Sequence, residues 1–151
     1  MNRLAAVTEG FRPPGVYRWL SRAHPESIRR ELVAAVWGMY PLDGRAITNA
    51  TQFLDRCAQA LAFPAWFGRN WDALADCLTD LSWLTGLGHV VLWDQYGTLA
   101  RHDPKAWALA HRVFGLSIEE RVRLGSPPLY LLLRGAGPID SPHGPELIPA
   151  L

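Results

Sequence analysis

The chain has 151 residues, of which 49% are hydrophobic and 19% are charged, and its formal net charge is +1. This length can bury a sizeable core, and the composition lacks the low hydrophobicity and high net charge typical of intrinsic disorder. No apolar run approaches the ~20 residues that cross a bilayer, and the first residues lack the basic and apolar plan of a signal peptide, so we expect a cytoplasmic protein without membrane contact.

Residues 1–35 predict an extension that precedes the core of the domain. Residues 1–14 indicate a loose arm, and residues 16–20 alternate enough to form a strand. Pro25 suits the first turn of a helix that runs to about residue 35. Because crossovers between parallel strands are right-handed, this strand and helix would extend a sheet by one parallel strand.

The next segments predict alternating strands and helices, which is the pattern of an α/β fold. A strand is expected over residues 36–42, and a helix over residues 50–61 with Thr48 or Asn49 as its cap. Residues 90–93 are apolar without alternation, as expected of a central strand that is covered on both faces.

The last part of the chain predicts one more helix, one more strand and a tail. Pro104 opens the helix, and residues 129–133 form the strand after a glycine- and proline-rich turn. Glycine and proline dominate residues 135–151, which predicts a mobile or surface-hugging tail. We expect residues 1–151 to form a single domain.

The two cysteines, Cys57 and Cys77, do not form a metal-ligand or redox spacing. Each falls on the apolar side of a predicted helix, where a free cysteine behaves as a small hydrophobic residue. We therefore expect reduced thiols in the core, with no metal and no cofactor.

The most informative run, residues 63–80, joins an aromatic loop to a helix with a carboxylate at every fourth position. Asn70 is a preferred N-cap residue, so the helix is expected to begin at Trp71. At about 100° per residue the helix separates an apolar face from an acidic face. The apolar face comprises Trp71, Leu74, Leu78 and Leu81, and the acidic face comprises Asp72, Asp76 and Asp80. Like charges at this spacing repel one another, and a cationic partner would relieve the repulsion.

Charge is segregated along the chain around this helix. Residues 57–100 contain four aspartates against the single basic residue Arg69, although the whole chain is slightly positive. A solvated face is the ordinary explanation of such acidic residues. A docking surface for a basic protein is the alternative explanation.

The run over residues 63–80 resembles the signature of the barstar family, whose members are intracellular protein inhibitors of small secreted ribonucleases of the barnase type. The matching positions are Pro64, Trp66, Phe67, Gly68, Asn70, Asp72, Ala73, Leu74, Asp76, Cys77, Leu78 and Thr79. The order of elements over residues 36–134 is also similar to that of barstar, which implies a small parallel β-sheet of three to four strands flanked by helices. Barstar lacks the extension over residues 1–35.

The resemblance implies that the chain inhibits an extracellular ribonuclease of the barnase type in a 1:1 complex. Asp76 would enter the cationic active site in place of the RNA phosphate, and Asp72 would pair with a second cation. Trp66 is assigned to apolar contact with the partner, whereas Phe67 is divided between the interface and the core. The expected partner-binding residues are Trp66, Phe67, Gly68, Asn70, Trp71, Asp72, Ala75, Asp76, Thr79 and Asp80.

Three positions limit what the resemblance transfers. Ala75 stands where barstar has a tryptophan, and Arg69 stands where barstar has a glutamate. The acidic contact from the fourth helix of barstar has two candidates in this chain, Glu119 and Glu120. The identity of the cognate nuclease therefore stays open.

Two other classes of function also stay open. In an enzyme, Asp72 and Asp76 would be metal ligands or an acid–base pair, and His89, His102 or His111 would carry protons. The sequence has no histidine or cysteine at ligand spacing and no glycine-rich phosphate loop to support this. A barstar-like binding module with a non-nuclease partner is the second alternative. Direct nucleic-acid binding is disfavoured because the aspartates beside the aromatic loop would repel phosphate.

Overall fold

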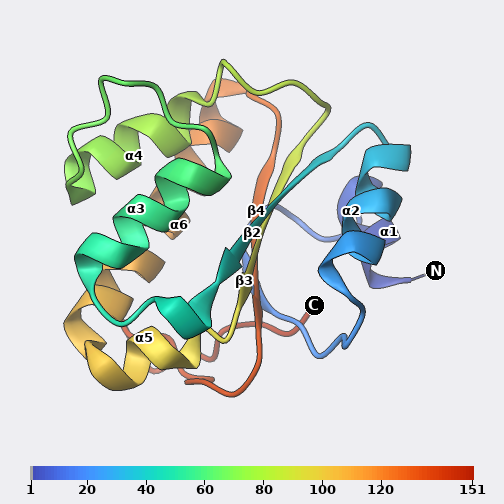
Figure 1. Ribbon diagram of the computed structural model, residues 1–151. Coiled ribbons are helices and arrows are strands. Elements are labelled where there is room, and N and C mark those ends of the chain that lie inside the picture. Colours follow the sequence, from blue (N-terminus) through green and yellow to red (C-terminus); the bar gives the residue numbers. More distant parts are fainter. Residues whose placement is uncertain (1) are drawn as a thin grey trace.

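The computed structural model describes residues 2–151, and its centre is a parallel sheet of four strands in the order β1-β4-β3-β2 (Figure 1). The strands are β1 (Val16–Arg18), β2 (Gly38–Asp43), β3 (His89–Asp94) and β4 (Leu129–Arg134). Val90 of β3 is in register with Met39 and Tyr130 on its two neighbours. The predicted α/β fold with a small parallel sheet is confirmed.

Helices cover both faces of the sheet (Figure 1). The helices α1 (Arg3–Thr8) and α2 (Pro25–Ala34) lie on one face. The other face carries α3 (Ala50–Ala60), α4 (Trp71–Asp80), α5 (Gly97–His102) and α6 (Pro104–Leu124), and a short 3-10 helix η1 (Gly44–Ala46) follows β2. All residues of β4, and all residues of β3 except Asp94, are buried, because each of these strands is covered from both sides.

Short polar side chains begin three of the helices, and the sequence predicts the caps of α3 and α4 among them. The side chains of Asn49, Asn70 and Asp103 accept hydrogen bonds from backbone N–H groups in the first turns of α3, α4 and α6. Pro104 occupies the first position of α6, where a missing N–H costs nothing. Gly125 ends the same helix in the left-handed conformation.

The prediction of a loose arm over residues 1–14 was wrong. Residues Arg3–Thr8 form α1, and Asn2 caps this helix by accepting a hydrogen bond from the Ala5 N–H at 2.7 Å. Leu4 and Val7 are buried in the core cluster that also contains residues of α2 and the sheet. The helix is short, so its stability comes from this burial and not from a local pattern.

The strand of the extension adds one strand to the sheet and pairs in parallel with β4, as the sequence predicts. The last residues of the tail over residues 135–151 lie against the outer side of this strand. The Leu151 N–H donates to the Arg18 carbonyl at 2.8 Å, and the Arg18 N–H donates to the Pro149 carbonyl at 2.8 Å. Ile148 and Leu151 are buried. The sequence predicted either a mobile tail or one that lies along the surface. The structure shows the second, and two side chains of the tail also enter the core.

The opposite edge of the sheet is β2, whose exposed Pro41 has no N–H to donate. No helix within residues 2–151 has the length and apolar character needed to cross a membrane.

Candidate partner-binding surface

The helix α4 begins where its cap predicts. The Asn70 side-chain carbonyl accepts a hydrogen bond from the Ala73 N–H at 2.8 Å, and Trp71 is the first helical residue. Arg69, directly before the cap, has a left-handed backbone with φ of 54°. This turn leads the chain from the aromatic loop into the helix.

The two faces of α4 are separated as predicted. Leu74 and Leu78 are fully buried in the core, whereas Asp72, Asp76 and Asp80 are exposed. Trp71 is half-buried, and its ring stacks on Phe53 with 5.9 Å between the centroids. Trp71 therefore anchors the helix to α3 and has only part of its surface free.

Both cysteines are free and buried, as predicted. Burial, together with smaller contributions from the nearby Asp76 and Asp80 carboxylates, raises the pKa of the Cys77 thiol to about 11. Burial also raises the pKa of the Cys57 thiol. Both thiols are therefore protonated at neutral pH and are poor nucleophiles.

The exposed carboxylates on α4 are not paired with basic side chains of the described residues. Within residues 2–151, none of Asp72, Asp76 and Asp80 forms an ion pair. The Asp80 carboxylate accepts only a long hydrogen bond of 3.3 Å from the Ser82 N–H. We refer to Asp72, Asp76 and Asp80 as the acidic stripe.

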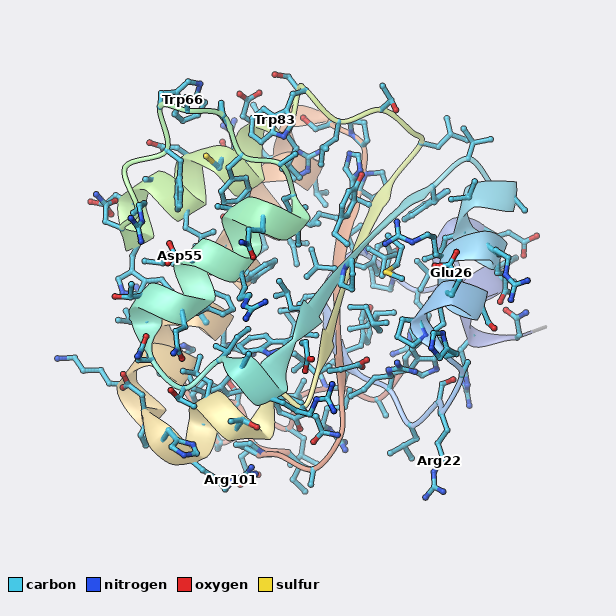
Figure 2. All side chains as sticks on the ribbon, viewed as in Figure 1. Arg22, Glu26, Asp55, Trp66, Trp83 and Arg101 are labelled. Atoms are coloured by element: carbon cyan, nitrogen blue, oxygen red, sulfur yellow. The ribbon has the colours of Figure 1, made fainter. Side chains whose placement is uncertain are left out.

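The aromatic residues beside the acidic stripe divide between the surface and the core. Trp66 is 60% exposed and its ring meets Trp83 edge-to-face with 6.3 Å between the centroids (Figure 2). Phe67 is half-buried and packs edge-to-face on Phe63 at 4.9 Å. Trp66 thus presents an apolar ring to solvent, whereas Phe67 mainly packs within the loop.

Trp83 is a member of this aromatic cluster that the sequence analysis did not identify. Its indole N–H donates to the Leu61 carbonyl at 2.9 Å, which fixes the ring between the α3 end and the loop after α4. The residue follows the predicted helix by only a few positions. Its tryptophan identity was the one available signal, since the contact with Trp66 joins two separate loops.

Arg69, the basic departure from the barstar pattern, pairs with Asp55 on α3. The guanidinium lies 2.7 Å from the Asp55 carboxylate, and both side chains are substantially exposed. Figure 2 shows Asp55 on α3. The positive charge of Arg69 is therefore partly neutralised beside the acidic stripe.

A hollow of about 470 Å³ lies between α4 and α6 next to the acidic stripe. Ala75 and Thr79 line it from α4. Glu119 and Glu120 line it from α6, and Glu120 pairs with Arg123, whose Nε lies 2.9 Å from the carboxylate. Both candidate glutamates are therefore adjacent to α4, and the small Ala75 side chain leaves the space between the helices open.

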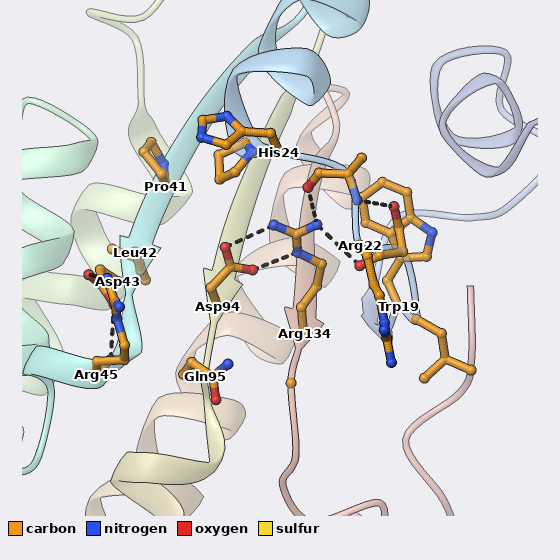
Figure 3. Close-up of a pocket in the computed structure, with 15 residues that line it drawn as sticks. Trp19, Arg22, His24, Pro41, Leu42, Asp43, Arg45, Asp94, Gln95 and Arg134 are labelled. Atoms are coloured by element: carbon orange, nitrogen blue, oxygen red, sulfur yellow. Dashed lines mark hydrogen bonds and ion pairs between the residues drawn. The ribbon is translucent and has the colours of Figure 1, made fainter.

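A second, larger cavity of about 910 Å³ lies at the carboxyl ends of the strands (Figure 3). Parallel sheets commonly bind ligands at this edge. Here Arg134 on β4 pairs with Asp94 on β3 at 2.6 Å, and it also donates to the carbonyls of Ser21 and Ala23. Arg134 and Asp94 thus satisfy each other, and their contacts join β3, β4 and the segment after β1.

The histidines considered for an enzymatic role lie in separate settings. His89 is buried and shares a hydrogen bond of 3.3 Å with the Tyr40 hydroxyl, and burial lowers its pKa to about 4. Burial also lowers the pKa of His111 to about 4, with a smaller contribution from His143. His102 contacts the Thr98 carbonyl at 2.9 Å. Among the residues of the described range 2–151, no three histidine, cysteine or acidic side chains are grouped to hold a metal ion.

Comparison with known proteins yields one family and several structures. The family model described as Barstar (barnase inhibitor) matches residues 38–132. No curated protein matches the chain.

The structural matches are distant. The Aeropyrum pernix ORC2 protein in its ADPNP-ADP complexes is 14% identical with a TM-score of 0.60, and the match covers 89% of this chain and 38% of that chain. The ADP form of the same protein gives 12% identity, a TM-score of 0.55 and the same two coverages. Drosophila ORC bound to AT-rich DNA and Cdc6 gives 17% identity and a TM-score of 0.50, covering 92% of this chain and 44% of that chain. The chain spans less than half the length of these structures, and at such identities the likeness concerns the fold alone.

Proposed function

This chain belongs to the barstar family, and from that premise we propose that it inhibits a small secreted guanyl-specific ribonuclease of the barnase type. In this proposal the two proteins form a 1:1 complex, and α4 covers the active site of the nuclease. The chain acts in the cytoplasm as an immunity protein, and it binds no nucleic acid directly.

The acidic stripe is the observation that carries this proposal. A ribonuclease binds the RNA phosphate with arginine, lysine and histidine side chains, so its empty active site has an excess of positive charge. Asp76, at the middle of the stripe, accepts charge-assisted hydrogen bonds from that site in place of the phosphate. Asp72 and Asp80 lie one turn to either side and pair with further cations. All three carboxylates are exposed and form no ion pair within residues 2–151.

The surroundings of the stripe supply the neutral part of the interface. The exposed ring of Trp66 contributes apolar contact area at low entropic cost, and Phe67 packs on Phe63 within the same loop. Gly68 and Asn70 are exposed at the turn, and Ala75 and Thr79 border the hollow between α4 and α6. Trp71 contributes the part of its surface that Phe53 leaves uncovered.

The test measures RNA cleavage by guanyl-specific ribonucleases in the presence of the purified chain. We expect the wild-type chain to abolish cleavage at a stoichiometric ratio. Asp76→Asn should weaken inhibition at least tenfold with little change in thermal stability, because an exposed residue contributes little to folding. Glu9→Gln is the matched control, since it removes one exposed negative charge at the end of α1, a helix on the opposite face of the sheet from α4.

Two outcomes would count against the proposal. If Asp76→Asn inhibits as well as the wild type, the acidic stripe does not occupy the active site. If the wild-type chain inhibits no guanyl-specific ribonuclease, the partner belongs to another class of protein.

A further inference from the structure

Arg121 is a buried cation on α6 that forms no ion pair with a carboxylate in the described part of the chain. Its side chain is 1% exposed. Removing a guanidinium from water costs several kcal/mol unless hydrogen bonds compensate. The contacts that compensate this cost therefore indicate what the residue does.

The guanidinium of Arg121 binds the last turn of α4. Its Nη1 donates to the carbonyls of Thr79 at 2.9 Å and Asp80 at 3.0 Å, with a longer contact of 3.4 Å to Leu78. These carbonyls lie in the last helical turn, where acceptors lack intrahelical partners and the helix dipole is negative. The side chain thus caps the carboxyl end of α4 from a different helix.

The same side chain fixes the loop that follows α6. Its Nε and Nη2 donate to the Pro127 carbonyl at 3.1 Å and 2.7 Å. One planar group therefore holds the end of α4, its own helix and the approach to β4 in a single arrangement. A lysine ammonium at this place would have no planar fork to reach both sides.

Arg121 lies next to the acidic stripe. The residues that it holds include Asp80 of the stripe, and it lines a cavity of about 760 Å³ together with Asp76 and Thr79. Repulsion within the stripe favours fraying of α4, and the last turn carries no basic side chain of its own to oppose it. Arg121 supplies that positive charge from α6.

We propose that Arg121 is a positioning residue for the acidic stripe. Its hydrogen bonds hold the last turn of α4, an arrangement we call the clamp, and thereby set the spacing of the Asp76 and Asp80 carboxylates. The functional part of this proposal rests on the proposed inhibition. The clamp itself is a property of the free chain.

The first measurement is amide hydrogen exchange of the free protein by NMR, with Arg121→Gln and Arg121→Lys compared with the wild type. We expect the amides of Thr79, Asp80 and Leu81 to exchange at least tenfold faster in both variants. Amides of Val91 and Leu131 in the sheet should change far less. Arg121→Lys retains the charge and keeps the test open where Arg121→Gln does not fold.

The control is Arg112→Gln, which removes one exposed charge from the same helix. Its exchange rates should equal those of the wild type. Uniform acceleration of all amides in the Arg121 variants would show a general role in stability and overturn the clamp. Unchanged exchange at Thr79 and Asp80 would overturn it equally.

The second measurement is the dissociation rate of the complex with a nuclease that the wild type inhibits. We expect Arg121→Lys to raise this rate at least tenfold and Arg112→Gln to leave it unchanged. Faster exchange with unchanged dissociation would overturn the link between the clamp and docking. Failure of the wild type to inhibit any ribonuclease would overturn the proposed function, whereas the exchange data would still decide the clamp.

Discussion

The Arg69 guanidinium pairs with the Asp55 carboxylate at 2.7 Å, across the gap between the turn before α4 and the side of α3. The only basic side chain in the run of residues 63–80 is therefore held by a carboxylate next to the acidic stripe. This pair reduces the positive charge next to the acidic stripe, although Asp55 is not part of the stripe.

Breaking this pair should change how fast the nuclease associates. Asp55→Asn leaves the Arg69 charge unopposed, so we expect association at low salt to slow about threefold, whereas Arg69→Gln should accelerate it by a similar factor. Stopped-flow measurements at two salt concentrations test this, because screening should remove the difference. Asp43→Asn is the control, since it makes the same charge change in the pair with Arg45, at the carboxyl edge of the sheet. Equal slowing in both variants would assign the effect to net charge alone.

The cap of α4 should affect both stability and inhibition. Asn70→Ala removes the hydrogen bond to the Ala73 N–H, so we expect a loss of about 1 kcal/mol in the free energy of unfolding. Asn49→Ala removes the same kind of cap from α3, at a similar cost. Urea unfolding and inhibition assays compare the two. Only Asn70→Ala should weaken inhibition beyond its effect on folding, and equal inhibition by both variants would separate the cap from docking.

The ion pair between Arg134 and Asp94 should be important for stability. Asp94→Asn leaves the buried Arg134 guanidinium without its counter-charge, and we expect a loss of about 3 kcal/mol in the free energy of unfolding. Asp43→Asn, in an exposed pair with Arg45, should cost about 0.5 kcal/mol. Thermal and urea unfolding measure both. Similar losses would show that burial of Arg134 does not decide the cost.

Stability should fall as the pH is lowered below about 6.5. Burial holds the pKa of His89 at about 4 in the folded chain, below its ordinary value of 6.5. Between these values the unfolded chain binds more protons, so stability rises with pH in this window and the contribution is fully present above 6.5. Urea unfolding at pH 7, 6 and 5 tests this. His89→Gln should give a shallower slope, whereas a slope unchanged from the wild type would exclude His89 as its source.

The tail should matter for folding more than for docking. Ile148 is 1% exposed, so Ile148→Ala should cost about 3 kcal/mol in the free energy of unfolding. Leu147 is 57% exposed, and Leu147→Ala should cost less than about 0.5 kcal/mol. The folded fraction of Ile148→Ala should still inhibit the nuclease, because the end of the tail pairs with β1 and the acidic stripe lies on α4. Loss of inhibition in fully folded protein would place the tail in the interface.

The features that the sequence predicted correctly depend on neighbours in the chain. The Asn70 cap and the two faces of α4 follow from spacings of three and four residues, so they can be read directly. Arg121 meets Thr79 across 42 positions, and Arg69 meets Asp55 across 14. No periodicity indicates which of the many arginines will find these partners, so both contacts required the structure.

The missed elements have a related cause. The helix α1 is too short to be stable alone, and it forms because Leu4 and Val7 pack in the same core cluster as Leu32 of α2. The tail resembles a flexible segment in composition, yet Ile148 and Leu151 insert into the core at the edge of the sheet. In both cases tertiary burial overrides the local composition.

The two rims of the sheet, which are the outer sides of β1 and β2, determine how easily a strand of another molecule can pair with it. On one rim the last residues of the tail pair with Arg18, and on the other Pro41 interrupts the row of donors. Neither rim offers a long, regular ladder to a strand from another molecule. The edges of this sheet therefore give little opportunity for edge-to-edge pairing between copies of the chain.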